Sequence, residues 1–387
     1  MITRTTSPIG PAWAATRLAL AAAALALFAG CDHSSTTQTP PPSPLRGMFL
    51  GGDVSSLARI EQLGGVFKDD GQAGSAITIL HAHGSNSFRL RLFVNPNDSD
   101  VVVNDLPYTV SLAQRVKASG SKLLLDLHYS DTWADPGHQT TPAAWASLGI
   151  DSLAARVQSY TDSVITTLKA AGALPDIVEV GNEIDGGILW PLGQLYVANA
   201  DTAVEWNQFT RLLKAGIAGV RAALGPGDSV RIMLHYGQGG DAGGTQWFYD
   251  HMNAYGVPYD VIGLSYYSWW HGPLSQLEAN LLSAESRYHK PIMVVETSYP
   301  WRLGGWESIA TNTVPMTGTF SPDGQAQFLK DLLGALESVP NGHGAGVVWW
   351  YPEAIQVNGL SVWGGGSLCL FDGSGDVLSA ASDFGAR

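Results

Sequence analysis

The sequence predicts an α/β fold, a (β/α)8 TIM barrel, and three observations support this prediction. Eight short apolar segments rich in Val, Ile and Leu occur along the chain, as expected for strands that are buried on both faces of a parallel sheet. Helical patterns separate them, most clearly at 152–171, where Leu153, Val157, Val164 and Leu168 recur at helical spacing. The chain has 387 residues, which is enough for one complete barrel.

The predicted strands and helices alternate from residue 48 onward. The predicted strands are 48–53, 87–94, 122–129, 177–183, 230–236, 261–267, 292–298 and 346–353. The predicted helices are 72–83, 107–119, 152–171, 202–224, 245–255, 274–288 and 322–338. Eight strands that alternate with helices in one apolar-cored chain favour a closed parallel barrel over an open sheet.

The segment before the barrel has the composition of a targeting signal followed by a linker. Arg4 and Arg17 are the only charges before the apolar run 18–28, and Ala-Gly-Cys31 follows it, which is typical of a secretory signal peptide at 1–31. Cys31 after Ala-Gly resembles the lipidation site of a bacterial lipoprotein. We therefore expect an exported protein that lipid on Cys31 anchors to a membrane, in the periplasm or at the cell surface. Phe28 departs from the usual aliphatic residue, so ordinary cleavage and secretion remain the alternative.

The composition of the rest of the chain narrows the possible partners. Residues 32–46 are rich in Pro, Ser and Thr and predict a disordered linker, so the barrel domain is expected at 47–387. The net charge of −13 disfavours nucleic acid as a partner. With Cys31 and Cys369 as the only cysteines, a disulfide framework is excluded. Neither metal-ligand spacing nor a nucleotide-binding fingerprint is found, so we expect no metal and no cofactor. We also expect a monomer.

Polar and aromatic side chains lie at the C-terminal ends of the predicted strands. Two of them are glutamates that end apolar runs, Glu183 and Glu296. Carboxylates at this rim of a barrel are typical of catalytic residues, and a pair of them is the minimum needed to split a glycosidic bond. The other strand-end candidates are Asp53, Arg91, His128 with Asp131, Asn182, His235 with Tyr236, Tyr266 with Tyr267, and Trp350.

Seven motifs make the chain resemble the glycoside hydrolase family 53 endo-β-1,4-galactanases, which are clan-A barrels. They are GDVSS (52–56), FKDDGQ (67–72), RLRLFVNP (89–96), DLHYSDTWADPG (126–137), VGNE (180–183), GLSYY (263–267) and ETSYP (296–300). The run 128–137 is the most specific of them, whereas Asn-Glu alone indicates only the clan. The resemblance extends from about 48 to 372.

The resemblance implies cleavage of β-1,4-galactan side chains of type I arabinogalactan with retention of configuration. It makes Glu183 the acid/base and Glu296 the nucleophile, and it places Asn182 at the sugar 2-hydroxyl. Arg91 is expected beside Glu296, where a cation would lower the pKa of that carboxyl. His128 and Tyr266 are expected to orient the pair through hydrogen bonds, and Trp350 to form the floor of the subsite for the cleaved sugar.

Several neighbouring residues have structural interpretations as well. Glu179 shares a strand face with Glu183 and is interpreted as a buried, paired carboxylate, and Asp126 as an ion-pair partner in the core. Trp133 is expected to bind sugar, because exposed aromatic faces stack on pyranoses. Trp269 and Trp270 fit binding and packing equally well.

Two other functions are compatible with the same residues. Another clan-A β-glycanase, such as a mannanase or xylanase, would also have Asn182, Glu183 and Glu296, and mainly the run 126–137 disfavours it. A non-catalytic glycan-binding lipoprotein is disfavoured because a pure binder does not need an opposed pair of carboxylates.

Overall fold

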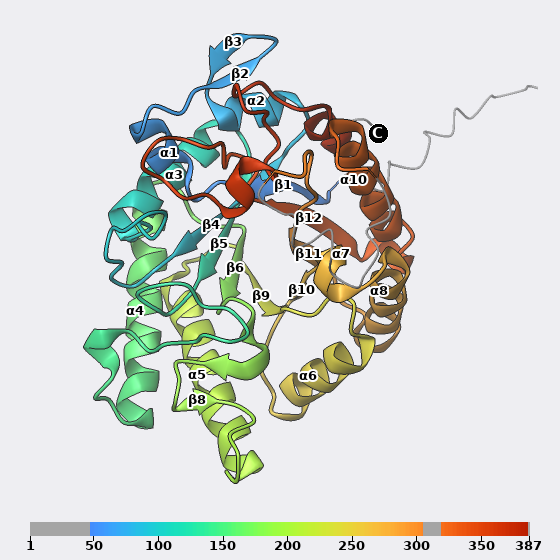
Figure 1. Ribbon diagram of the computed structural model, residues 1–387. Helices are drawn as coiled ribbons and strands as arrows, with labels where there is room; N and C mark the ends of the chain where they lie inside the picture. The colour runs from blue at the N-terminus through green and yellow to red at the C-terminus, as the bar shows by residue number, and fades with distance from the viewer. Residues whose placement is uncertain (1–46, 305–318, 386–387) are drawn as a thin grey trace, which may run out of the picture. The chain divides into compact units, whose positions relative to one another are not determined.

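Eight parallel strands form a closed barrel in the computed structural model, which describes residues 47–304 and 319–385. The hydrogen-bonded order is β1-β12-β11-β10-β9-β6-β5-β4, and Figure 1 shows the strands as a ring with helices around it. The strands are β1 (Phe49–Asp53), β4 (Ser87–Leu92), β5 (Lys122–Leu127), β6 (Ile177–Val180), β9 (Arg231–Tyr236), β10 (Val261–Ser265), β11 (Ile292–Thr297) and β12 (Gly344–Trp350). The predicted fold class and all eight predicted strands are confirmed.

The helices cover the outside of the barrel, and apolar stripes face the strands. They are α1 (Leu57–Gln62), α2 (Ala76–Ala82), α3 (Leu106–Ala118), α4 (Ile150–Ala170), α5 (Thr202–Ala223), α6 (Ala242–Ala254), α7 (Ser268–His271), α8 (Leu274–Tyr288) and α10 (Pro322–Glu337). In α4 the buried residues include Leu153, Val157, Val164 and Leu168, which are the residues whose spacing predicts the helix. Within the described residues, no helix is both long and apolar enough to cross a membrane.

The sequence pattern missed several short elements. The predicted helix at 72–83 is in part the hairpin of β2 (Phe67–Asp69) and β3 (Gln72–Gly74), and the helix begins only at Ala76. A second hairpin, β7 (Gly187–Ile188) with β8 (Gly193–Gln194), and the short helices α1 and α7 were not predicted. Elements of two to six residues contain too few apolar positions to establish a period.

The barrel interior is apolar at one end and charged further along the strands. Side chains near the strand starts pack into one cluster, which is Phe49, Leu124, Ile177, Met233, Val261, Met293, Val295 and Val348. Towards the strand ends the interior contains fully buried charged groups, including Arg89, Asp126 and Glu179. The apolar layer closes one end, so the polar layer can open only at the C-terminal rim, where barrel enzymes place their active sites.

Candidate active site

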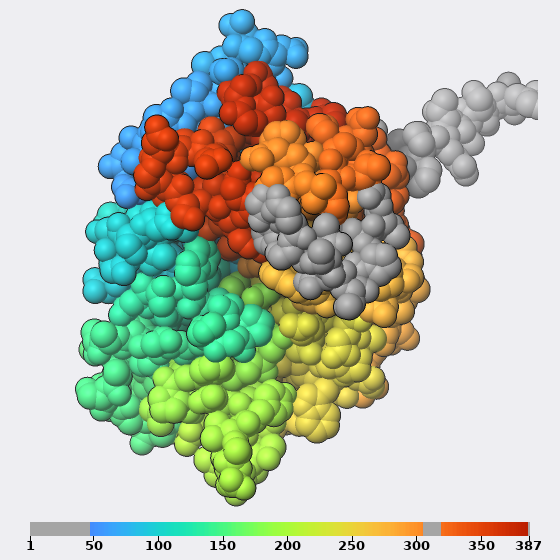
Figure 2. Space-filling model, viewed as in Figure 1, coloured from blue at the N-terminus to red at the C-terminus, as the bar shows by residue number. Residues whose placement is uncertain are grey.

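A cavity of about 710 Å³ lies at the C-terminal rim of the barrel. Five sequence-predicted site residues line it, which are Trp133, Asn182, Glu183, Glu296 and Trp350, and Tyr267, Trp270 and Trp363 line it as well. Figure 2 shows this face in atomic detail, with the segment after β6 in light green and the segment after β12 in red on opposite sides of it. A cavity that holds Glu183 and Glu296 together with several aromatic rings has the character of a sugar-binding cleft.

The backbone after β6 turns sharply to present Glu183. Gly181 has φ +88°, and a Cβ there would lie 2.6 Å from Cγ2 of Ile184, so a side chain at this position would be strained. Glu183 itself has φ 42° and ψ 61°, a left-handed conformation that non-glycine residues adopt rarely and mostly where function or packing imposes it. The amide of Gln139 donates to the carbonyls of Asn182 and Glu183 at 2.8 and 3.2 Å and holds this turn.

The Glu183 carboxyl is in an environment that favours its protonated form. Burial and the nearby Glu296 raise its pKa well above the ordinary value. Its strongest contact is a hydrogen bond of 2.6 Å between Oε1 and the Ser265 hydroxyl. A carboxyl group that keeps its proton near neutral pH can act as a general acid.

Glu296 has cationic and hydroxyl donors on both carboxylate oxygens. Arg89 Nη1 donates to Oε1 at 3.0 Å and Tyr267 donates to Oε2 at 3.1 Å. Burial raises the pKa of Glu296, while Arg89 lowers it, so the expected net lowering of this pKa is not found. The donors still favour ionisation at Glu296 over Glu183, whose carboxyl receives a single hydrogen bond, from Ser265, within the described residues.

Arg89, rather than Arg91, is the cation beside Glu296, so the expectation for Arg91 was wrong. Arg89 has no exposed surface and also contacts Asp53, Asp126 and Glu179 at 2.8–3.1 Å. It donates to Asn182 Oδ1 at 2.7 Å as well.

Arg91 packs among aromatic rings instead of binding a catalytic carboxylate. Its guanidinium lies 4.5 Å from the ring centre of Trp133 and 5.1 Å from that of Tyr351. It donates to the Ser56 hydroxyl and the Val101 carbonyl. Arg91 lies two residues nearer the rim than Arg89, and it therefore supports the aromatic side of the cavity rather than the carboxylate pair.

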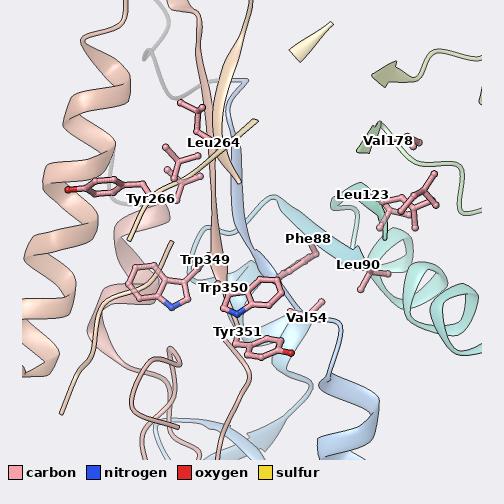
Figure 3. Packing of buried hydrophobic residues seen from close by; sticks show 14 of the residues in the cluster. Val54, Phe88, Leu90, Leu123, Val178, Leu264, Tyr266, Trp349, Trp350 and Tyr351 are labelled. Carbon is pink, nitrogen blue, oxygen red and sulfur yellow. The ribbon is translucent and has the colours of Figure 1, made fainter. Parts of the chain in front are cut away.

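Tyr267, rather than Tyr266, contacts the carboxylate pair, so the expectation for Tyr266 was also wrong. The Tyr266 ring packs parallel to Phe328 of α10, and its hydroxyl donates to the Gly272 carbonyl. Figure 3 shows Tyr266 beside a helix and directed away from Trp350. Ser265 and Tyr267 are two residues apart and both contact the pair, as alternation along a strand requires. Applying that alternation from Ser265 would have identified Tyr267.

His128 and Asp131 hold the loop after β5, and His128 does not make the predicted hydrogen bonds to the carboxylate pair. His128 Nε2 lies 2.8 Å from Asp126 Oδ2, and its Nδ1 accepts from the Ala134 amide at 3.1 Å. Burial lowers the pKa of His128 to about 3, so the ring is neutral. Asp131 accepts from the amides of Asn95 and Ala143 and does not line the cavity.

Asn182 and Trp350 both line the cavity. Asn182 is held by Arg89 and donates to the Ala134 carbonyl at 2.7 Å. Trp350 lines the cavity and stacks on Tyr351, with ring centres 4.5 Å apart. Trp270 lines the cavity and is 55% exposed, whereas Trp269 is buried, which separates the two residues that the sequence left open.

The interpretations of Glu179 and Asp126 as buried, paired carboxylates are confirmed, because both pair with Arg89 inside the barrel. Sequence reasoning missed Ser265 and Gln139 as parts of the site, and it placed His235 at a strand end without giving it a role. They come from three different segments, and only the barrel register brings His235 and Ser265 next to Glu183. Cys31, with the predicted signal peptide and linker, lies outside the described residues.

Comparison with known proteins gives one consistent result. The model of "Glycosyl hydrolase family 53" matches residues 49–384. An uncharacterized protein of Niallia circulans is 42% identical over 346 residues, which cover 86% of this chain and 92% of that protein. An arabinogalactan endo-beta-1,4-galactanase of Thermothelomyces thermophilus is 34% identical over 348 residues, which cover 87% of this chain and 98% of that protein.

A solved structure agrees with these sequence relatives. The "Ignisphaera aggregans GH53 catalytic domain" has a TM-score of 0.80 and 32% identity, over 89% of this chain and 97% of that one. The family match extends over nearly the whole barrel, and the matched region contains both glutamates of the cavity. The chain therefore belongs to glycosyl hydrolase family 53 and is a glycoside hydrolase.

Proposed function

We propose that the protein is an arabinogalactan endo-β-1,4-galactanase that hydrolyses galactan with retention of configuration. The observation that carries the proposal is the unequal environment of two carboxyl groups in one cavity. Glu183 has a pKa raised well above its usual range, whereas Glu296 is held by Arg89 and Tyr267. A retaining enzyme needs this division into a proton donor and an ionised nucleophile. The galactanase activity of the Thermothelomyces relative supports the choice of substrate.

The proposed reaction has two steps. Glu183 gives its proton to the leaving glycosidic oxygen while Glu296 attacks the anomeric carbon, which forms a glycosyl-enzyme and breaks the bond between two sugars. Glu183, now a carboxylate, then takes a proton from a water molecule that displaces Glu296. Asn182 is held by Arg89 and is proposed to bind the 2-hydroxyl, and Trp350 and Trp133 to stack on the sugar rings.

The test is a substrate panel with analysis of products and stereochemistry. Linear β-1,4-galactan should give short oligosaccharides, and NMR should show the β-anomer before mutarotation. Xylan and mannan serve as controls for the other two glycanase activities. Glu296→Gln should abolish the cleavage. Cleavage of xylan or mannan in preference to galactan, or an α-anomeric first product, would refute the proposal.

We also propose that the protein is exported and anchored through lipid on Cys31. The proposal depends on the basic, apolar and small-residue order of residues 1–31. Expression in a bacterium with membrane fractionation tests it, since Cys31→Ser should move the enzyme from the membrane fraction to the soluble exported fraction. A wild-type protein that is already soluble after export would rule out the anchor.

A further inference from the structure

Four side chains form a continuous line of hydrogen bonds from the barrel interior to Glu183. Glu179 Oε1 lies 2.7 Å from His235 Nδ1, His235 Nε2 lies 2.8 Å from the Ser265 hydroxyl, and that hydroxyl lies 2.6 Å from Glu183 Oε1. Glu179, His235 and Ser265 have no exposed surface. A chain of bonds this short, shielded from water, couples the protons of its members.

The inner end of the line accepts hydrogen and cannot supply it. Arg89 donates to both carboxylate oxygens of Glu179, at 2.8 and 3.0 Å, and the pKa of Glu179 is lowered to about 2. Nδ1 of His235 must therefore carry a hydrogen towards Glu179. The amide nitrogen of Glu183 lies 3.3 Å from the same Nδ1, which is farther than Glu179, and a protonated Nδ1 does not accept from it.

The outer part of the line can hold one mobile proton in either of two places. The Ser265 hydroxyl has a single hydrogen. When Glu183 is protonated, it can donate to Ser265, and Ser265 donates to Nε2 of a neutral His235. When Glu183 is ionised, Ser265 donates to Glu183, and Nε2 of a protonated His235 donates to Ser265.

We propose that His235 is a positioning residue that shares the acid/base proton with Glu183 through the Ser265 hydroxyl. In the exchange the Glu183 O–H bond breaks as a new Ser265 O–H bond forms. The original Ser265 O–H bond breaks as Nε2–H forms, so two protons shift in a relay, the net transfer is one proton, and no other reactant takes part. The imidazolium is held by Glu179. The proposal rests on the proposed function only in naming Glu183 as the acid/base.

Other charged groups also face His235 and influence where the proton is held. Asp126, Asp185 and Glu296 each interact with it electrostatically, and so does His271. Asn182 Oδ1 lies 3.2 Å from Nδ1. Arg89 opposes a positive charge on His235. The three carboxyl groups that Arg89 contacts, Glu179, Asp126 and Glu296, lie in the same layer of the barrel and favour that charge.

The first experiment observes the proton directly, without substrate. In protein labelled with ¹⁵N-histidine, the Nδ1 shift of His235 should stay at the hydrogen-carrying value across the pH range. The Nε2 shift should lie between the hydrogen-carrying and the hydrogen-free values at pH values where Glu183 and His235 share one proton. In Glu183→Gln the amide cannot share a proton, so Nε2 should move to the hydrogen-free value. Nε2 fixed at one limit in the wild type, and unchanged in Glu183→Gln, would overturn the proposal.

The second experiment measures the alkaline limb of kcat/KM on galactan. Two sites that share a proton lose it at a higher pH than one site does, by about 0.3 units when the sharing is equal and by more when His235 holds most of it. His235→Gln keeps a donor towards Ser265 but cannot accept the shared proton, so the alkaline limb should move to lower pH. His138→Gln is the matched control, because that ring is exposed and contacts only Asp135.

The outcomes separate this proposal from simpler roles of His235. A fall in kcat with an unmoved limb would mean that His235 only supports the fold. A limb that moves to higher pH would mean that His235 is a fixed cation. Absence of any galactan cleavage by the wild type would refute the proposed function, while the NMR result would still decide whether the proton is shared.

Discussion

Arg89 binds Glu179 with two parallel hydrogen bonds, Nε to Oε2 at 3.0 Å and Nη2 to Oε1 at 2.8 Å, and neither side chain has exposed surface. The same guanidinium contacts Asp53, Asp126 and Glu296. One buried cation thus lies among four carboxyl groups, and burial raises the pKa of Asp126 well above its usual range. Arg89 compensates the charge of these groups, and an unpaired buried charge is strongly unfavourable.

Replacing Arg89 should therefore destabilise the whole barrel. Arg89→Met should lower the free energy of unfolding by about 3–5 kcal/mol, the usual cost of removing one partner from a buried ion pair. Urea unfolding followed by tryptophan fluorescence measures it. Arg287→Met is the matched control, since Arg287 makes the same two-bond contact with Asp250 on the surface and should change stability little. Equal losses in the two variants would contradict this account.

Tyr267 should matter for the reaction and Tyr266 should not. Tyr267→Phe removes a donor from the ionised form of Glu296, and kcat should fall by about tenfold or more, since a hydrogen bond to a charged group contributes about 1.5–3 kcal/mol. The acid limb of the pH profile should move to higher pH, because Glu296 without this donor is protonated more easily. Kinetics of Tyr267→Phe on galactan over a range of pH tests both points.

Tyr266→Phe is the control for that experiment. It removes only the bond to the Gly272 carbonyl, so kcat and the pH limbs should match the wild type even if stability falls. A larger kcat loss in Tyr266→Phe than in Tyr267→Phe would restore the role first predicted for Tyr266.

Glu353 should make the protein less stable as the pH rises. It has no exposed surface, accepts from the Ser56 amide at 2.9 Å, and burial raises its pKa to about 8. A carboxyl whose folded pKa is raised stabilises the fold fully below its unfolded pKa near 4.3, and this stability is lost as pH rises through the folded pKa. The loss should therefore develop between about pH 4.3 and pH 8.

Glu353→Gln measures that contribution. The amide keeps an acceptor for Ser56 and does not ionise, so its unfolding free energy relative to the wild type should increase with pH, by at most about 1.4 kcal/mol per unit. Urea unfolding of both proteins at pH 4, 6 and 8 gives the difference. A difference that stays constant with pH would show that Glu353 does not titrate in this window.

The sequence was informative about the fold because long apolar strands and helical periods depend on local order alone. The eight strands and the glutamates Glu183 and Glu296 could be located in this way. Residue roles inside the barrel depend on the register between strands, which cannot be derived from the sequence pattern. Arg89 and Arg91 share a strand face, and their different depths along β4 decide which of them meets Glu296. Likewise, the register shift between Leu264 and Ser265 places Ser265 opposite Glu296.

The two glutamates of the cavity should respond differently to the chemistry of the leaving group. In Glu183→Ala, an aryl galactoside with a leaving group that needs no proton should still form the glycosyl-enzyme, whereas galactan should not be cleaved. Azide should then accelerate turnover of the aryl substrate, because it replaces the water that Glu183 no longer activates. In Glu296→Ala the nucleophile is missing, so an activated leaving group should not restore a retaining reaction.

The measurement compares both variants on galactan and on the aryl galactoside, with and without azide. Glu183→Ala with azide should give a galactosyl azide of retained configuration, which NMR identifies. Because Glu183 contacts Ser265 and Glu296 contacts Arg89 and Tyr267, the variants Ser265→Ala and Tyr267→Phe should show the same contrast in weaker form. Equal rescue of both alanine variants, or rescue of Glu296→Ala alone with retention, would reverse the assignment of acid/base and nucleophile.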